Sequence, residues 1–269
     1  MSDSPVNEVQ RIQNEYLRRD KEGLSNIYTY SNPSFLFHMQ ERERIILKQL
    51  KKLKVNIEKS CILEVGCGTG HILARFKEFG ANDATGIDLM AHRIHEGKIT
   101  YPNLKLFHGN AANLPFDDNS FDIVMQFMCL SSVLDHEMRK QIVSEMWRVL
   151  KPGGVILFYD LKPPSTILRI IKKIGKIVIK SRGFFCENNN HKRDNNSISN
   201  RQTPIKWLDK PDIKTLFSQG NSRIKSASLD FDLAGFSNYS LILTLIASFF
   251  PFLTTHYLAF IEKPLKKRS

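Results

Sequence analysis

The sequence predicts an α/β fold built on a mostly parallel sheet with helices on both faces. Two observations indicate this: short, wholly apolar strand-like segments recur along residues 61–160, and helix-like segments separate them. No internal repeat is visible in the sequence. Strands buried on both faces are expected to be continuous apolar runs, and parallel strands need long, usually helical, crossovers. The 269 residues suffice for one large domain with additions.

The predicted elements follow one another in a regular order. Residues up to about Leu53 are expected to be helical, because Pro33 stands where a first-turn proline belongs and apolar residues recur at helical spacing. The core is predicted to contain strands 61–66, 83–89, 103–109, 121–128 and 153–160, with helices 71–80 and 137–150 among them.

The pattern changes after Asp160. A basic segment comes first, and the Asn-rich residues 186–203 after it predict a polar, mobile loop. The alternation resumes with helix 209–219, strand 223–234, an apolar helix and a last strand, 256–263.

Charge is distributed unevenly along the chain. Residues 1–160 hold 20 basic and 20 acidic residues, whereas residues 161–269 hold 19 and 7, so the second part carries the whole net charge of +12. A uniformly lysine-rich composition would not confine the excess to one part. The asymmetry therefore predicts a negatively charged partner for the second part.

The cysteines and the N-terminal residues bear on the cellular compartment. Cys61, Cys67, Cys129 and Cys186 show no CxxC spacing, so neither a zinc site nor a disulfide framework is predicted. The first residues are polar and include acids, without the apolar core of a signal peptide. We therefore expect a cytoplasmic protein with no bound metal.

The segment LEVGCGTGHIL, residues 63–73, carries the strongest functional signal. Gly66, Gly68 and Gly70 alternate directly after a strand and before a helix, where glycine permits a sharp turn and a close approach of backbone N–H groups to a ligand. Glu64 precedes them and would suit a cationic ligand better than a pyrophosphate. A plain strand–helix turn is the alternative.

Three further motifs follow in order. Asp88 ends the second predicted strand, where a carboxylate can accept hydrogen bonds from both ribose hydroxyls. GNAANLPFDDNSFDIV (109–124) and VLKPGGVILFYD (149–160) come next. Together, residues 60–160 resemble the class I S-adenosylmethionine-dependent methyltransferases of the type 11-like, small-molecule branch, which has GDAxxLPFxxxxFD and LKPGG signatures.

The resemblance implies a Rossmann-like, doubly wound seven-stranded sheet whose last strand runs antiparallel, and S-adenosylmethionine as cofactor. Glu64 and the glycine turn would surround its methionine part, Asp88 its ribose, and Leu89 its adenine. Asn110 replaces the usual aspartate, and its amide oxygen can still accept from the adenine amino group, although we expect weaker cofactor binding. The implied cofactor-binding residues are Glu64, Gly66, Cys67, Gly68, Gly70, Asp88, Leu89, Asn110, Ala111 and Gln126.

An antiparallel last strand would begin at the sheet edge where ligands bind, which places His256 near Asp160. His256, His136 and Asp160 are the candidate catalytic residues, because histidine has the pKa best suited to taking a proton from an acceptor hydroxyl. The alternatives are an ordinary strand-end or helix-start role, and catalysis by alignment without a strong base.

Residues 167–180, ILRIIKKIGKIVIK, predict an amphipathic helix with a broad apolar arc opposite a face of lysine and arginine. Two interpretations stay open: the apolar arc packs on the protein, or residues 165–182 lie in the headgroup layer of an anionic membrane. The apolar segment 241–253 is too short to span a bilayer and could reinforce the second. Nucleic acid is not an expected partner, because no RNA-binding module is recognisable.

Two stretches, NPSFLFHMQERERIILKQLKK (32–52) and PFLTTHYLAFIEKP (251–264), are similar to a bacterial group of methyltransferases linked with surface-polysaccharide biosynthesis. The resemblance implies O-methylation of a glycan or lipid-linked glycan at the cytoplasmic membrane face, with a small metabolite or quinone-like lipid as the alternative acceptor. A non-catalytic, cofactor-binding regulatory or membrane-docking subunit is a third hypothesis. The predicted parts are a helical cap (1–56), the cofactor-binding core (57–160), a basic insertion with a polar loop (161–206) and a segment that completes the sheet (207–269).

Overall fold

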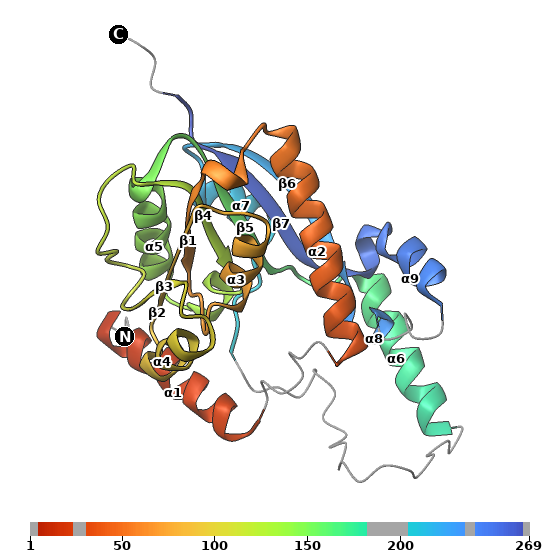
Figure 1. Ribbon diagram of the computed structural model, residues 1–269. Helices are drawn as coiled ribbons and strands as arrows, with labels where there is room; N and C mark the ends of the chain where they lie inside the picture. Colours follow the sequence, from red (N-terminus) through yellow and green to blue (C-terminus); the bar gives the residue numbers. More distant parts are fainter. Residues whose placement is uncertain (1–4, 24–30, 182–203, 235–239, 266–269) are drawn as a thin grey trace.

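The computed structural model describes residues 5–23, 31–181, 204–234 and 240–265 (Figure 1). Its centre is a seven-stranded sheet in the order β3-β2-β1-β4-β5-β7-β6. Neighbouring strands from β3 to β5 are parallel, and β7 is antiparallel to both β5 and β6. The strands are β1 (Cys61–Val65), β2 (Asp83–Asp88), β3 (Lys105–His108), β4 (Phe121–Phe127), β5 (Leu150–Leu161), β6 (Asn221–Leu229) and β7 (Thr254–Glu262). The predicted doubly wound sheet with an antiparallel last strand is confirmed.

Helices cover both faces of this sheet (Figure 1). They are α1 (Pro5–Lys21), α2 (Pro33–Lys52), α3 (His71–Glu78), α4 (Ala91–Thr100), α5 (His136–Val149), α6 (Thr166–Ser181), α7 (Lys210–Leu216), α8 (Phe231–Ala234) and α9 (Leu241–Ser248). The short 3-10 turns among the described residues are η1 (Ile57–Lys59), η2 (Leu130–Ser132) and η5 (Pro251–Leu253). Side chains of α5 and α7 form one core layer with the sheet, and those of α2, α3 and α4 form the other.

Helix α2 begins as the sequence predicts. Pro33 occupies the first turn of α2, and the side chain of Asn32 caps it by accepting hydrogen bonds from the backbone N–H groups of Ser34 and Phe35. Ile46 and Leu50 of α2 then lie fully buried against the sheet. Helix α2 is therefore part of the core and brings its inner face to the carboxyl ends of the strands.

Two segments predicted as single elements are divided in the structure. The strand expected over 223–234 ends at Leu229, and α8 follows it. Helix α9 ends before Pro251, which starts a separate turn because proline cannot continue a helix. The segment 186–203, expected to be a polar loop, lies outside the described residues.

The basic segment forms the predicted helix, α6. The exposure of its described side chains shows how much of its apolar arc packs on the protein. Leu168 is 1% exposed, whereas Ile167, Ile170, Ile171 and Ile174 are 38–54% exposed. Among the described side chains, the apolar arc therefore packs on the protein at Leu168 and leaves its four isoleucines exposed. Within the described part of the chain, no helix is long and apolar enough to cross a bilayer.

Candidate functional site

The glycine turn connects β1 to α3 in a left-handed backbone conformation. Gly66, Gly68 and Gly70 have φ angles of +72°, +56° and +86°, a region that other residues rarely adopt. A Cβ atom on Gly66 would lie 2.8 Å from the Cys129 Sγ atom, whereas one on Gly68 would meet nothing within 4 Å. The turn thus packs tightly on one side and is open on the other.

Asp88 ends β2, and its carboxylate organises this turn. Its Oδ2 atom accepts a 2.8 Å hydrogen bond from the backbone N–H of Gly68, and its Oδ1 atom accepts a 2.8 Å bond from Met90. A carboxylate oxygen can accept more than one hydrogen bond, so acceptance from ribose hydroxyls remains open. The position fits the ribose role predicted for Asp88, which stays a prediction.

Glu64 supplies a buried carboxylate beside the turn. It is 1% exposed, and its Oε2 atom has no hydrogen-bond partner in the described part of the chain. Burial raises the pKa of Glu64 well above its ordinary value; the Arg42 guanidinium opposes this shift and the Asp88 carboxylate adds to it. A buried acid without a full set of partners is costly, so the site favours a cationic group.

These observations fit S-adenosylmethionine. The open side of Gly68 gives room for a close approach, the Asp88 carboxylate can accept from hydroxyls, and the unpaired Glu64 oxygen faces no competing donor among the described residues. A positively charged methionine moiety would supply the partner that Glu64 lacks. The residues present therefore match the expected cofactor in charge and in hydrogen-bonding capacity.

The remaining predicted cofactor residues surround the same edge of the sheet. Leu89 and Ala111 are half-buried against the core layer that holds Cys129. The Asn110 Oδ1 atom accepts a 2.9 Å hydrogen bond from the backbone N–H of Ala112, which leaves one acceptor direction for an adenine amino group. Gln126 is fully buried at the end of β4.

The Gln126 side chain orders the backbone after β4, and the nearby Cys67 and Cys129 thiols are not reactive. The Gln126 Oε1 atom accepts from the N–H groups of Cys129, at 3.0 Å, and Leu130, at 3.3 Å, and so fixes the start of η2. Burial raises the pKa values of the Cys67 and Cys129 thiols, which therefore stay protonated at neutral pH.

The three predicted catalytic residues do not come together. In the β5–β7 ladder Asp160 is paired with Tyr257, and Leu161 is paired with His256. Side chains alternate between the two faces of a sheet, so Asp160 and His256 point to opposite faces. A single acid–base group made of both is therefore excluded.

Asp160 lies on the face that carries η2. It is fully buried, and its carboxylate accepts hydrogen bonds of 2.9 Å from the backbone N–H groups of Ser131 and Leu161. Burial raises the pKa of Asp160 to about 6, and hydrogen bonds from Ser131 and other donors limit the rise. The group is ionised at neutral pH and is a stronger base than an ordinary carboxylate.

His256 belongs to an aromatic cluster on the opposite face. Its ring stacks on Tyr159, with centroids 4.5 Å apart and planes at 7°, and its Nδ1 atom lies 2.9 Å from the Thr255 hydroxyl. Burial lowers the pKa of His256 well below its ordinary value, and the neighbouring His38 and Arg42 side chains add to this. The imidazole is therefore neutral at neutral pH.

His136 has a different setting. It is the first residue of α5, is exposed, and lines a groove of about 220 Å³ with Trp147 and Phe217. No hydrogen bond or ring contact between described residues joins it to Asp160 or His256. The early-helix role therefore describes His136 adequately.

Helix α1 lies across the edge of the sheet that holds the glycine turn (Figure 1). Arg11 donates a 2.6 Å hydrogen bond to the Ser132 carbonyl, and the Tyr16 hydroxyl is 2.9 Å from the Ser132 hydroxyl. Further along α1, Asp20 forms an ion pair with Arg93 of α4. The helix thus connects the turn after β4 with the helix after β2.

Arg42 is a site residue that the sequence reasoning missed. Only 8% exposed, its guanidinium lies over the rings of Phe127, at 4.9 Å, and Tyr159, at 5.2 Å. Arg42 lies on the inner face of α2 with Met39 and Ile46. The sequence therefore contained a sign of its role, because a charged residue occupies a position where the helical spacing predicts an apolar one.

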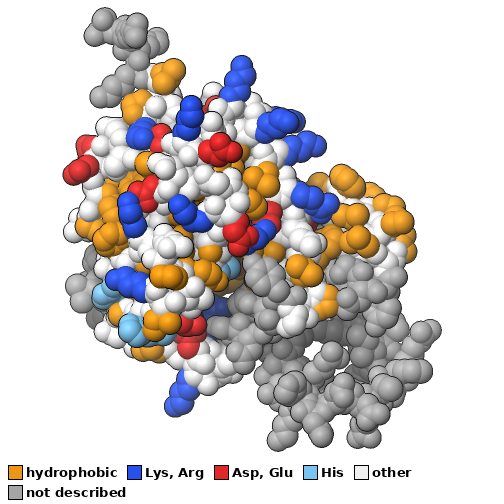
Figure 2. Space-filling model, in the orientation of Figure 1, with side chains coloured by type: hydrophobic (Ala, Val, Ile, Leu, Met, Phe, Trp, Pro, Cys, Tyr) orange, Lys and Arg blue, Asp and Glu red, His pale blue; other side chains and the backbone are white. Residues whose placement is uncertain are grey.

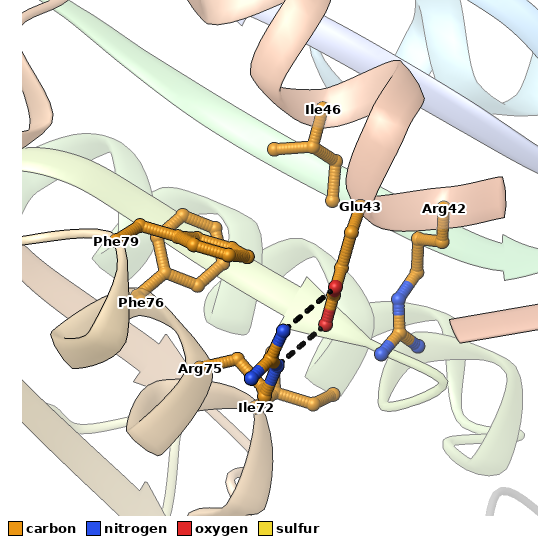
Figure 3. A pocket seen from close by; sticks show the side chains of 7 residues that line it. All are labelled: Arg42, Glu43, Ile46, Ile72, Arg75, Phe76 and Phe79. Atoms are coloured by element: carbon orange, nitrogen blue, oxygen red, sulfur yellow. Dashed lines mark hydrogen bonds and ion pairs between the residues drawn. The ribbon is translucent and has the colours of Figure 1, made fainter. Parts of the chain in front are cut away.

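An ion pair next to Arg42 joins α2 to α3 (Figure 3). The Arg75 guanidinium donates to both carboxylate oxygens of Glu43, at 2.9 and 3.1 Å, while Arg42 lies beside Glu43 on the same helix. The cavity between them measures about 10 Å³, which holds about one water. It is a packing gap rather than a ligand site.

Comparison with known proteins adds independent findings. Residues 63–158 match the model of a family described as methyltransferase domain. A demethylmenaquinone methyltransferase from Staphylococcus aureus is 33% identical over 172 residues, which cover 62% of this chain and 68% of that protein. The chain belongs to the S-adenosylmethionine-dependent methyltransferases. Its cofactor is S-adenosylmethionine.

The other similarities set the limits of this assignment. A demethylmenaquinone methyltransferase from Staphylococcus epidermidis is 36% identical over 132 residues, but the match spans about half of each chain, 47% and 53%. Two solved structures share the fold. Magnesium protoporphyrin IX methyltransferase from Synechocystis has a TM-score of 0.60 and 12% identity, and the match covers 95% of this chain and 99% of that protein. A methyltransferase from Methanosarcina mazei has a TM-score of 0.52 and 20% identity, and the match covers 78% of this chain and 94% of that protein.

Proposed function

We propose that this methyltransferase methylates a quinone-like lipid at the inner face of the cytoplasmic membrane. The observation that carries the proposal is the likeness to the two staphylococcal proteins named demethylmenaquinone methyltransferases, at 33% and 36% identity. The exposed apolar residues of α6 support an amphiphilic acceptor over a water-soluble one.

The chain's residues have three tasks in such a reaction. When bound, S-adenosylmethionine supplies a methyl group on a positively charged sulfur. Glu64 and Asp88 would hold that donor, and the edge formed by η2 and α1 would hold the acceptor beside it. As the acceptor's new bond to the methyl group forms, the methyl–sulfur bond would break and leave the sulfur neutral, and the acceptor must lose a proton to a base or to water.

We infer that Asp160 is the proton acceptor. Its carboxylate is ionised at neutral pH, its raised pKa of about 6 makes it a better base than an exposed aspartate, and it lies at the carboxyl end of β5. His256 is neutral, but its lowered pKa makes it a weak base. The exposed position of His136 gives no comparable support.

Two other functions remain as alternatives from the sequence. One is O-methylation of a glycan or lipid-linked glycan, and the other is a cofactor-binding subunit without turnover. Both share the donor site and differ from the first proposal in the acceptor. The choice among them therefore depends on an acceptor screen and not on cofactor binding.

The screen uses the purified protein, S-adenosylmethionine with a labelled methyl group, and three kinds of acceptor: reduced quinones with short and long prenyl chains, lipid-linked glycans, and small soluble phenols. We expect label in the reduced prenylated quinones, and loss of it in Asp160→Asn, with cofactor affinity by calorimetry unchanged. Label only in the glycans would overturn the quinone proposal. Cofactor binding without transfer to any acceptor would favour the non-catalytic subunit.

A further inference from the structure

Helix α9 and the turn η5 expose an unusually large set of apolar side chains. Phe249 is 81% exposed, Ile242 71% and Leu243 67%. Figure 2 shows hydrophobic side chains gathered over this part of the molecule, at the right of the view. The exposed apolar members of this surface are Leu241, Ile242, Leu243, Ile246, Phe249, Phe250 and Phe252.

This surface is held firmly to the body of the protein. Thr244 faces inward at 3% exposed, and Leu245 packs with Leu253 against buried Phe37 and Leu229. Helix α9 therefore has a packed face and an unpartnered face, and the exposed residues belong to the second. The exposure results from the fold rather than from a loosely attached segment.

Helix α6 extends the same surface (Figure 1). The Ser165 hydroxyl, next to the start of α6, donates a 2.6 Å hydrogen bond to the Phe252 carbonyl of η5, and α6 contacts η5 directly. Four exposed isoleucines of α6, Ile167, Ile170, Ile171 and Ile174, thus continue the apolar surface that α9 begins. We refer to these residues and the exposed apolar residues of 241–252 as the docking surface.

The charged residues within the two segments that form the docking surface have one sign. Residues 240–261 contain no charged residue, and residues 166–181 contain five basic and no acidic residues. Arg169 and Lys173 are exposed, whereas Lys172 is turned inward and forms a 2.7 Å ion pair with buried Asp230. Apolar residues flanked by exposed cations match the acyl boundary and phosphate layer of an anionic bilayer.

We propose that the docking surface inserts into the headgroup layer of an anionic membrane. The inference deepens the proposed function, because a lipid acceptor would then enter near the site: η5 leads directly into β7, whose fourth residue, Tyr257, pairs with Asp160 of β5. In this contact, α9 supplies most of the apolar side chains that enter the membrane, and the exposed cations of α6 lie beside them.

Vesicle sedimentation with the full-length protein tests the proposal. We expect binding to vesicles of phosphatidylglycerol and phosphatidylcholine. The triple variant Ile242→Ser, Leu243→Ser, Phe249→Ser should lose it, and Arg169→Glu with Lys173→Glu should weaken it by about 30-fold or more, from about a fivefold effect for each cation removed and further repulsion from each added acid. Lys172 is unsuitable, because changing it would also remove its ion pair with buried Asp230.

Matched controls separate docking from general attraction of a basic protein to an anionic surface. Ile99 is 70% exposed on α4, outside the docking surface, so Ile99→Ser should bind vesicles as the wild type does. Lys51→Glu with Lys52→Glu removes two exposed cations of α2 and should have a much smaller effect than the α6 pair. Equal losses in both charge pairs, or an unchanged triple variant, would overturn the proposal.

Two further measurements make every outcome decisive. Size-exclusion chromatography with light scattering detects a second copy: a wild-type dimer that the triple variant converts to monomer, without vesicle binding, would assign the surface to self-association and overturn the membrane proposal. Methyl transfer to a short-chain, water-soluble quinol should persist in the triple variant, while transfer to a long-chain quinol in vesicles should fall. Vesicle binding without any methyl transfer would refute the proposed acceptor and leave the docking surface intact.

Discussion

Replacing Asp160 by asparagine should change how the stability of the protein depends on pH. Burial raises the pKa of Asp160 from 3.8 to about 6, so the folded state prefers the protonated acid. Each pKa unit corresponds to about 1.4 kcal/mol, which makes the ionised carboxylate about 3 kcal/mol less stable in the folded state than in the unfolded chain.

The sign and the pH window follow from these two pKa values. Below pH 3.8 the acid is protonated in both states and contributes no penalty, and between pH 3.8 and about 6 the folded state loses stability as pH rises. Between pH 4.5 and 7.5 the loss is about 2 kcal/mol. Asparagine does not titrate, so the difference in unfolding free energy between the two proteins isolates this one group.

The assay is urea denaturation of wild type and Asp160→Asn at pH 4.5, 6.0 and 7.5. We expect the wild type to lose about 2 kcal/mol relative to the variant across this range, although the variant also loses a hydrogen bond from Ser131 or Leu161 at every pH. A constant difference between the two proteins would refute the reasoning, since it would mean that Asp160 titrates alike in both states.

Three further predictions concern the cofactor edge. Glu64→Gln removes a buried carboxylate of raised pKa, so the apoprotein should become more stable at pH 8 in denaturant titration while S-adenosylmethionine affinity by calorimetry falls. Gly66→Ala should destabilise by about 2–5 kcal/mol and Gly68→Ala by only about 1–2, because both need left-handed backbone but only the first would strike Cys129. Tyr16→Phe should lose the hydroxyl contact of α1 and about 1 kcal/mol in thermal unfolding; an unchanged melting temperature would contradict it.

The sheet could be predicted because its signal is local. Each core strand is a short apolar run ended by a turn residue, and the structure reproduces the predicted positions of β1, β2 and β4 to within a residue or two. The glycine turn was equally clear, because three alternating glycines between a strand and a helix have few other uses.

The end of β6 shows where local signals fail. Apolar residues continue to alternate past Leu229 to Phe231 and Leu233, which is why the strand was expected to reach 234. In the structure Ser228 takes a positive φ of 56°, and Glu41 of α2 accepts a 3.1 Å hydrogen bond from the Leu229 N–H. The strand ends because of a helix nearly two hundred residues earlier in the sequence, which no local pattern contains.

The arrangement of the candidate bases depends on the same kind of information. Sequence reasoning placed Asp160 and His256 at one sheet edge, and both do lie at the corresponding strand ends. Whether they share a face depends on the pairing of β5 with β7, because a shift of one residue would move every β7 side chain to the other face. The observed register, Asp160 opposite Tyr257, buries Leu258 and Phe260 in the layer under α2 and α3. Packing of those two side chains therefore carries His256 to the Arg42 side, and leaves Asp160 on the opposite face, beside η2, where we propose it as the base.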